Sequence, residues 1–251
     1  MTHSEGILVK IRLILSTLAV AISAALIGST AVATAAPVSE RQIGGNRFVE
    51  VKQDGTAAIW KQAPPTYTTV KSYQGYANVR AVAGLGSGWY LALRNNNELL
   101  ECEIDNTERC TLINGGFSPT RLLAGLSTTT FLEVTQDGHL IRWSWTGGSW
   151  KSVGIQGTGW QNARIIIGLD ANTFLEINNA NDLVRWSWAN NQWNGAKVGQ
   201  GWQNTRLLAS VSSTQFVEVR NDGVLVEWSA SGGSYTGRQA GQGWQSARLL
   251  G

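Results

Sequence analysis

Hydrophobic residues occur along most of the chain in short runs that are separated by clusters of Gly, Asn, Asp and Ser. Residues 164–168 form an aliphatic run, residues 174–178 form a second, and residues 183–188 alternate between apolar and polar side chains. A turn rich in Asn then leads to a fourth run near residues 193–198. Short runs bounded by turn residues are typical of β-strands. Because the turns leave no room for helices, the pattern predicts an all-β chain.

The pattern repeats with a period of about 42 residues. Aromatic residues mark the second predicted strand of each repeat: Phe48, Tyr90, Phe131, Phe174 and Phe216. An arginine marks the first strand: Arg80, Arg121, Arg164, Arg206 and Arg248. Four residues before each arginine stands another aromatic side chain: Tyr76, Phe117, Trp160, Trp202 and Trp244. A period of this length is typical of repeat architectures, and four antiparallel strands per repeat describe a propeller blade.

The two ends of the repeat region complement each other. The first repeat begins at its second strand, with Phe48, whereas the chain ends on a first strand, residues 247–251. We therefore predict a five-bladed β-propeller in which residues 247–251 join residues 47–72 in one blade. Such closure leaves no free strand edge at the termini. The alternative is an open array of repeats.

Residues 1–35 have the features of a secretory signal. Lys10 and Arg12 precede an uncharged apolar run, and small residues follow at 33–35. This order predicts cleavage after Ala35, a single propeller domain over residues 36–251 and an extracellular, monomeric protein with no membrane attachment. The alternative is a membrane anchor, for which the apolar run is short, since a span needs about 20 residues.

Composition narrows the function classes. The net charge is +3, with no block of Lys and Arg, so no nucleic-acid partner is expected. The chain has two His and two Cys, and they form no cluster with metal-ligand spacing. No Ser-His-Asp arrangement can be built around His139. The sequence thus predicts a non-catalytic protein with no cofactor and no metal.

The Gly-Trp-x-x-x-Arg strings, the Asp-Gly hairpins, the period and the five repeats resemble the tachylectin-2-like five-bladed β-propellers over residues 43–251. The resemblance implies a secreted lectin that binds glycans carrying N-acetylglucosamine or N-acetylgalactosamine, with one site per blade.

Strand parity predicts where such sites lie. In four antiparallel strands, the loop that leads into the first strand and the hairpin between the second and third strands share one end of the blade. That end should carry aromatic, amide and carboxylate groups, a combination that recognises sugars. The candidate sugar-binding residues are Trp160, Gln161, Asn162, Trp202, Gln203, Asn204, Trp244, Gln245, Asp137, Asp222, Tyr76 and Asn78. The alternative is that the Trp residues wedge between blades while the amides cap strand ends.

The five predicted sites are unequal. Three lead-in loops keep Gly-Trp-Gln, whereas the first carries Tyr76 with Asn78 and the second carries Phe117 with Pro119. We therefore expect three strong sites, one weaker site and one poor site. Two other functions remain open: a secreted scaffold that binds a protein partner through the same face, and a hydrolase acting on glycans.

Two further sets of residues recur with the repeat. Trp residues of the third strand, at 143, 145, 186, 188 and 228, are expected to pack between adjacent blades. Glu residues of the second strand, at 50, 133, 176 and 218, are expected to pair with the arginine of the same blade, for example Arg164 with Glu176. The alternative for these charges is a channel that binds an ion or an acidic ligand.

Cys102 and Cys110 lie on the two arms of the hairpin around Asn106 in the second repeat. In an exported protein, this placement predicts a disulfide that replaces the aromatic packing lost where Cys102 stands in the position of the third-strand Trp. The alternative is a pair of buried thiols.

Overall fold

A computed structural model describes residues 45–104 and 109–251, which form five four-stranded antiparallel sheets. We number these blades from the one that holds both termini of the described fold. Blade 1 contains β20 (Ala247–Leu250), β1 (Arg47–Lys52), β2 (Ala57–Ala63) and β3 (Thr66–Tyr73). Blade 2 contains β4 (Val79–Gly86), β5 (Trp89–Arg94), β6 (Leu99–Glu103) and β7 (Arg109–Asn114). Blade 3 contains β8 (Thr120–Ser127), β9 (Thr130–Thr135), β10 (Leu140–Thr146) and β11 (Ser149–Gly157).

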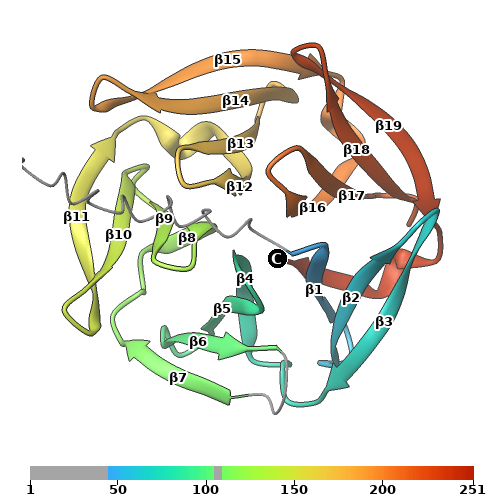
Figure 1. Cartoon of the computed structure of the whole chain (residues 1–251). Helices are drawn as coiled ribbons and strands as arrows, with labels where there is room; N and C mark the ends of the chain where they lie inside the picture. The colour runs from blue at the N-terminus through green and yellow to red at the C-terminus, as the bar shows by residue number, and fades with distance from the viewer. Residues whose placement is uncertain (1–44, 105–108) are drawn as a thin grey trace, which may run out of the picture. The chain divides into compact units, whose positions relative to one another are not determined.

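Blade 4 contains β12 (Ala163–Asp170), β13 (Thr173–Asn178), β14 (Asp182–Ala189) and β15 (Gln192–Gln200). Blade 5 contains β16 (Thr205–Ser212), β17 (Gln215–Arg220), β18 (Leu225–Ser231) and β19 (Ser234–Gly241). Short 3-10 helices at Trp160–Asn162, Trp202–Asn204 and Trp244–Ser246 lead into three of the first strands. The first strands contact one another around the centre, and the fourth strands lie outermost (Figure 1). The predicted five-bladed β-propeller is therefore confirmed.

The ring closes as the sequence predicts. β20 pairs with β1, with Leu250 opposite Glu50 and Leu249 opposite Val51. Beyond the strand, Val49 N donates to Gly251 O at 2.6 Å, and Gly251 N donates back to Val49 O at 2.9 Å. Figure 1 shows the C-terminus beside β1. One blade is thus built from both ends of the repeat region.

The predicted signal, residues 1–35, and the hairpin tip at Asn106 lie outside the described residues. Within residues 45–104 and 109–251, no helix has the length and apolar character needed to cross a membrane.

Cross-strand aromatic pairs fill the core of the blades. Phe174 lies opposite Trp186 and Phe216 lies opposite Trp228, and in both pairs the rings stack. Phe174 and Phe216 are fully buried, whereas Trp186 and Trp228 are half-buried. Residues directly opposite each other on antiparallel strands have side chains in contact, so the repeated Phe and Trp place the same aromatic pair in blades 1, 3, 4 and 5.

The arginines join neighbouring blades, so the predicted pairing of Arg164 with Glu176 in one blade is wrong. Arg164 Nη2 donates to Trp202 O of the next blade at 2.5 Å, and Arg121 Nη2 donates to Trp160 O at 2.6 Å. The lead-in carbonyls Trp160 O and Trp202 O each accept one hydrogen bond, from the backbone N–H of Ala163 and Thr205 respectively. A carbonyl oxygen has a second lone pair, and a guanidinium offers donors in a fork that can reach two such oxygens. This also explains why Arg80 persists beside Ala92: Arg80 donates to Thr120 O and Phe117 O of blade 3.

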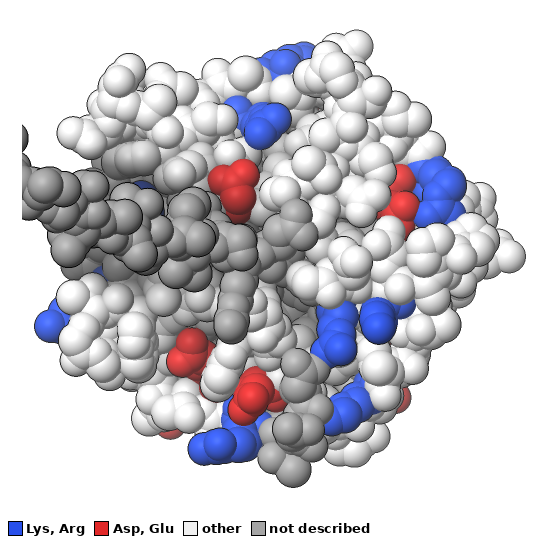
Figure 2. Space-filling view, viewed as in Figure 1, with Lys and Arg blue, Asp and Glu red and all other residues white. Residues whose placement is uncertain are grey.

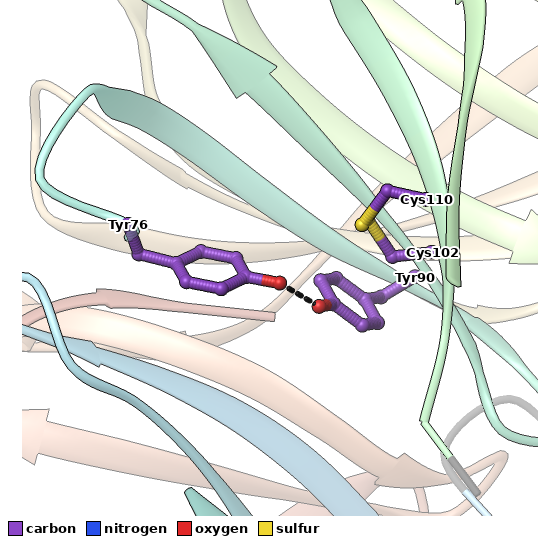
Figure 3. Close-up of a disulfide and its surroundings, with 4 residues drawn as sticks. All are labelled: Tyr76, Tyr90, Cys102 and Cys110. Atoms are coloured by element: carbon purple, nitrogen blue, oxygen red, sulfur yellow. Dashed lines mark hydrogen bonds between the residues drawn. A yellow bond between two sulfur atoms is a disulfide. The ribbon is translucent and has the colours of Figure 1, made fainter. Parts of the chain in front are cut away.

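The predicted disulfide between Cys102 and Cys110 is confirmed: the two residues lie opposite each other on β6 and β7, and their sulfur atoms are bonded (Figure 3). It occupies the place in blade 2 where other blades carry a third-strand Trp.

Mass spectrometry of the native protein, produced in an oxidising compartment, should find the peptides of Cys102 and Cys110 linked, because such a compartment preserves a disulfide on adjacent strands. Alkylation under native conditions should modify neither residue. Two thiols that react with an alkylating agent in the folded protein would contradict this assignment.

Candidate functional site

The lead-in loops and the hairpins between second and third strands share one end of the propeller, as predicted. Asn179 N donates to Asn162 O at 2.8 Å, and Asn221 N donates to Asn204 O at 2.9 Å, so loop and hairpin of one blade are in contact. Each loop also contacts the preceding blade, since Trp160 N donates to Gly138 O at 3.0 Å. The candidate residues are thus brought to one end of the propeller.

The lead-in aromatic residues are wedged between blades. Trp160, Trp202 and Trp244 are each 7% exposed, and Tyr76 is 5% exposed. Each Trp packs against a third-strand Trp: the ring centroids of Trp160 and Trp186 are 4.8 Å apart, as are those of Trp202 and Trp228. The ring faces are therefore occupied by protein, although Trp160, Trp202 and Tyr76 each line part of a groove.

Two of the candidate amides hold the hairpin of the preceding blade. Gln161 Nε2 donates to Asp137 O at 2.8 Å, and Gln245 Nε2 donates to Asp222 O at 3.1 Å. Both glutamines are exposed, as are Gln203, Asn162, Asn204 and Asn78. These amide side chains are therefore exposed at the end of the propeller where the lead-in loops lie. Asn204 also lines the groove between blades 4 and 5.

The two candidate aspartates make local contacts within their hairpins. Asp137 Oδ2 lies 2.9 Å from His139 Nδ1, and Asp222 Oδ1 accepts a hydrogen bond from Val224 N at 3.0 Å. Thr135 also donates to Asp137, and this hydrogen bond lowers the pKa of the Asp137 carboxyl. The aspartates thus shape the hairpins that the glutamines contact.

Grooves lie between neighbouring blades. The groove between blades 4 and 5 has a volume of about 410 Å³, and the groove between blades 3 and 4 has about 240 Å³. Each is bounded by the end of one blade's fourth strand, by the lead-in Trp and by the face of the next blade. The first is lined by Glu218, Arg220, Trp202, Trp228 and Tyr235, and the second by Glu176, Trp160, Trp186 and Trp193.

Each of these grooves contains a buried carboxylate that is held by an indole. Trp228 Nε1 donates to Glu218 Oε2 at 2.9 Å, and Trp186 Nε1 donates to Glu176 Oε2 at 2.8 Å. The same bond joins Trp60 to Glu50 and Trp143 to Glu133. A carboxylate retains further acceptor sites when one oxygen accepts a single bond, so it can receive hydroxyl donors from a ligand.

The second carboxylate oxygen differs between the grooves. Thr205 Oγ1 donates to Glu218 Oε1 at 2.5 Å, whereas Ala163 occupies the corresponding position in blade 4. Burial raises the pKa of Glu176 above its usual value, and the Trp186 hydrogen bond opposes this effect. Burial likewise raises the pKa of Glu50, where Ala247 replaces the threonine. Glu176 and Glu50 are therefore buried carboxylates that a hydrogen-bond donor would stabilise.

The sequence pattern did not identify the carboxylates as site residues, because these glutamates were expected to pair with arginines. The third-strand Trp residues were expected to pack between blades. A signal was present: Glu and Trp stand ten residues apart in four repeats, and the second repeat replaces both, with Ala92 and Cys102. Joint loss of both residues indicates that they act as a pair, since a buried carboxylate without its donor is costly.

Charged side chains do not gather on the face shown in Figure 2, where Lys, Arg, Asp and Glu are dispersed among uncharged residues. Across residues 45–104 and 109–251, no three side chains of His, Cys, Asp or Glu are placed to hold a metal ion together.

Comparison with solved structures finds similarity to many chains, among them a lectin and a domain of Nup159. The SapL1 lectin, determined in complex with alpha methyl fucoside, is 13% identical, with 83% of this chain and 82% of that chain covered and a TM-score of 0.49. The N-terminal domain of Nup159 is 12% identical, with a TM-score of 0.38. The aligned part is 80% of this chain, which spans 61% of the Nup159 domain. No protein-family model and no curated protein matches the chain.

Proposed function

We propose that this protein is a carbohydrate-binding protein whose sites are the grooves between blades. The observation that carries the proposal is the buried carboxylate of Glu176 or Glu218, held by a Trp Nε1 at the base of a groove that aromatic edges enclose. A sugar needs such a combination, because its C–H groups pack on aromatic surface while its hydroxyls need fixed acceptors.

In this proposal each part of the groove between blades 4 and 5 has a role. Glu218 accepts sugar hydroxyls, and Arg220, whose Nε lies 3.2 Å from Glu218 Oε2, donates to a sugar oxygen. Trp228 and Tyr235 bound the groove with half-buried aromatic surface. In the groove between blades 3 and 4, Glu176 has the acceptor role and Trp193 takes the place of Tyr235.

The finer assignment follows the resemblance to the tachylectin-2-like propellers: glycans carrying N-acetylglucosamine or N-acetylgalactosamine, bound by a secreted, monomeric and non-catalytic protein. Several weak sites on one rigid ring would act together through avidity. A glycan array on residues 36–251 tests this ligand class without assuming a particular sugar.

The decisive variant replaces three carboxylates together, Glu50→Gln, Glu176→Gln and Glu218→Gln. The Gln Oε1 still accepts from the Trp Nε1, so the blades should fold, whereas the charged acceptor is lost. A hydrogen bond to a charged group contributes about 1.5–3 kcal/mol, and about 1.4 kcal/mol corresponds to tenfold in affinity. Calorimetry with N-acetylglucosamine should therefore show at least a tenfold loss.

The matched control replaces Gln161, Gln203 and Gln245 by Ala, which leaves the grooves unchanged. Sugar affinity should stay within a small factor of the unmodified protein. If the Gln→Ala control loses sugar binding and the Glu→Gln variant keeps it, sugar recognition lies on the lead-in loops instead. If no sugar on the array binds the folded protein, the carbohydrate proposal fails, and a secreted protein-binding scaffold becomes the better hypothesis.

A further inference from the structure

The groove between blades 1 and 2 differs from the grooves that carry the proposed function. It has a volume of about 420 Å³. Its lining is formed by Tyr76, Val79, Ala92, Arg94, Leu100 and the disulfide of Cys102 and Cys110, with Gln74 and Gly75 of the lead-in segment. The groove is therefore as large as the one between blades 4 and 5, but its lining contains neither Glu nor Trp.

The replacement removes the carboxylate and the indole together. Ala92 stands where Glu176 and Glu218 stand in blades 4 and 5, and Cys102 stands where Trp186 and Trp228 stand. The disulfide and a tyrosine pair take over the packing: the hydroxyls of Tyr76 and Tyr90 are hydrogen-bonded to each other beside Cys102 (Figure 3). The blade thus remains well packed without an acceptor for sugar hydroxyls at this position.

The three grooves differ in the net charge of the residues that line them. Glu176 is the charged residue that lines the groove between blades 3 and 4. Glu218 and Arg220 both line the groove between blades 4 and 5, and Arg94 alone lines the groove between blades 1 and 2. Counting these residues, the grooves carry one negative charge, no net charge and one positive charge.

A second guanidinium lies close to the same groove. Arg248 donates to Tyr76 O at 2.8 Å and to Val79 O at 2.6 Å, and both of these residues line the groove. The corresponding Arg121 and Arg206 interact electrostatically with Glu176 and Glu50 of the next blade. At the position that Arg248 faces, blade 2 has Ala92, so this guanidinium lacks the buried carboxylate that its counterparts have.

Arg94 already forms an ion pair with Glu98, but this pair leaves the guanidinium accessible to a ligand. Arg94 Nη1 lies 3.1 Å from Glu98 Oε2, and the side chains are 46% and 34% exposed. Exposed pairs at this spacing contribute only about 0–1 kcal/mol. A ligand carboxylate could therefore share or replace Glu98 as the partner of Arg94, and a planar guanidinium binds a carboxylate through two parallel hydrogen bonds.

We propose that the groove between blades 1 and 2 binds an acidic sugar, one that carries a carboxylate, through Arg94. The sugar part of this inference rests on the proposed function, whereas the charge preference rests on the lining of this groove alone. The protein would then bind neutral amino sugars in some grooves and a carboxylate-bearing sugar in another.

The test is calorimetry with methyl glucuronide and, separately, with N-acetylglucosamine. Wild type should bind methyl glucuronide more weakly at high salt. Arg94→Gln should lower this affinity at least tenfold, since a charge-assisted bond is removed, and should leave N-acetylglucosamine affinity unchanged. Arg94→Lys should retain part of the affinity for methyl glucuronide, because lysine keeps the positive charge but cannot form the two parallel hydrogen bonds of a guanidinium. Lys151→Gln, which removes an exposed positive charge on β11, is the matched control and should have no effect.

The outcomes separate the two proposals. Methyl glucuronide binding that Arg94→Gln leaves intact, or an equal loss in Lys151→Gln, would overturn the acidic-sugar assignment, as would N-acetylglucosamine binding without any glucuronide binding. Glucuronide binding that depends on Arg94, in a protein that binds no neutral sugar, would support the acidic site and would remove the neutral-sugar function instead. Far-UV circular dichroism and a melting curve for each variant establish that it is folded.

Discussion

Deletion of Ala247–Gly251 is expected to unfold the protein or convert it to oligomers. The deleted segment is the first strand of blade 1, and its removal exposes the edge of β1, which Glu50 and Val51 share with Leu250 and Leu249. An unpaired strand edge is a template for pairing with another chain. The truncated protein should therefore lose its cooperative melting transition or elute from size-exclusion chromatography as multimers.

The loss is large because this strand does more than pair with β1. Ala247 and Leu250 are buried in the core, and Arg248 is one of the links between blades 1 and 2, since it donates to Tyr76 O and Val79 O. The control is Arg248→Gln, which keeps the strand and removes only the hydrogen bonds from the guanidinium to blade 2, and it should lower the melting temperature without unfolding the ring. A truncated protein that is monomeric and as heat-stable as the full chain would contradict closure by β20.

Gly168→Ala is expected to be strongly destabilising. A methyl carbon placed on Gly168 would lie 1.8 Å from the Gly125 carbonyl oxygen of the neighbouring first strand, far inside van der Waals contact. The methyl carbon would be attached directly to the backbone of one sheet, and the carbonyl oxygen belongs to the backbone of the next sheet. Neither atom can therefore move away as the end of a flexible side chain would. Overpacking of this kind costs about 1–3 kcal/mol or more. At roughly 2–4 °C per kcal/mol for a domain of this size, calorimetry should show a melting temperature lower by about 2–12 °C.

Gly115→Ala is the matched control for this substitution. No heavy atom lies within 4 Å of a methyl carbon on Gly115, and its backbone needs no left-handed conformation. Its melting temperature should stay close to that of the unmodified protein. Equal stabilities for Gly168→Ala and Gly115→Ala would show that the first strands can separate at the centre of the propeller.

The architecture was accessible from the sequence because it depends on periodic features. The repeated Phe and Arg positions determine where strands begin, and the offset between the first repeat and residues 247–251 predicts how the ring closes. The disulfide was accessible for a similar reason, since Cys102 and Cys110 lie on two arms of one hairpin and pair by register. Strand positions and hairpin register can be predicted from such local patterns without knowing which blades are in contact.

Partners across blades were decided by the tertiary structure alone. Within one repeat, Arg164 and Glu176 lie on adjacent strands, and the sequence therefore predicts a pair between them. In the fold, Arg164 is directed to Trp202 O of the next blade, and Glu176 accepts from Trp186. The physical reason is that loop carbonyls between blades have unmet hydrogen-bonding capacity, which the periodicity of the chain does not reveal.

The candidate site depends on the same distinction. The sequence by itself determined which residue types recur: an indole in each of three lead-in loops, and a carboxylate and an indole ten residues apart in four repeats. Only the tertiary structure decided that Trp160 and Trp202 are buried as wedges and that Glu176 and Glu218 line the grooves instead. A groove between blades is formed by segments of two repeats, so its lining follows from how the blades pack, which a single repeat does not encode.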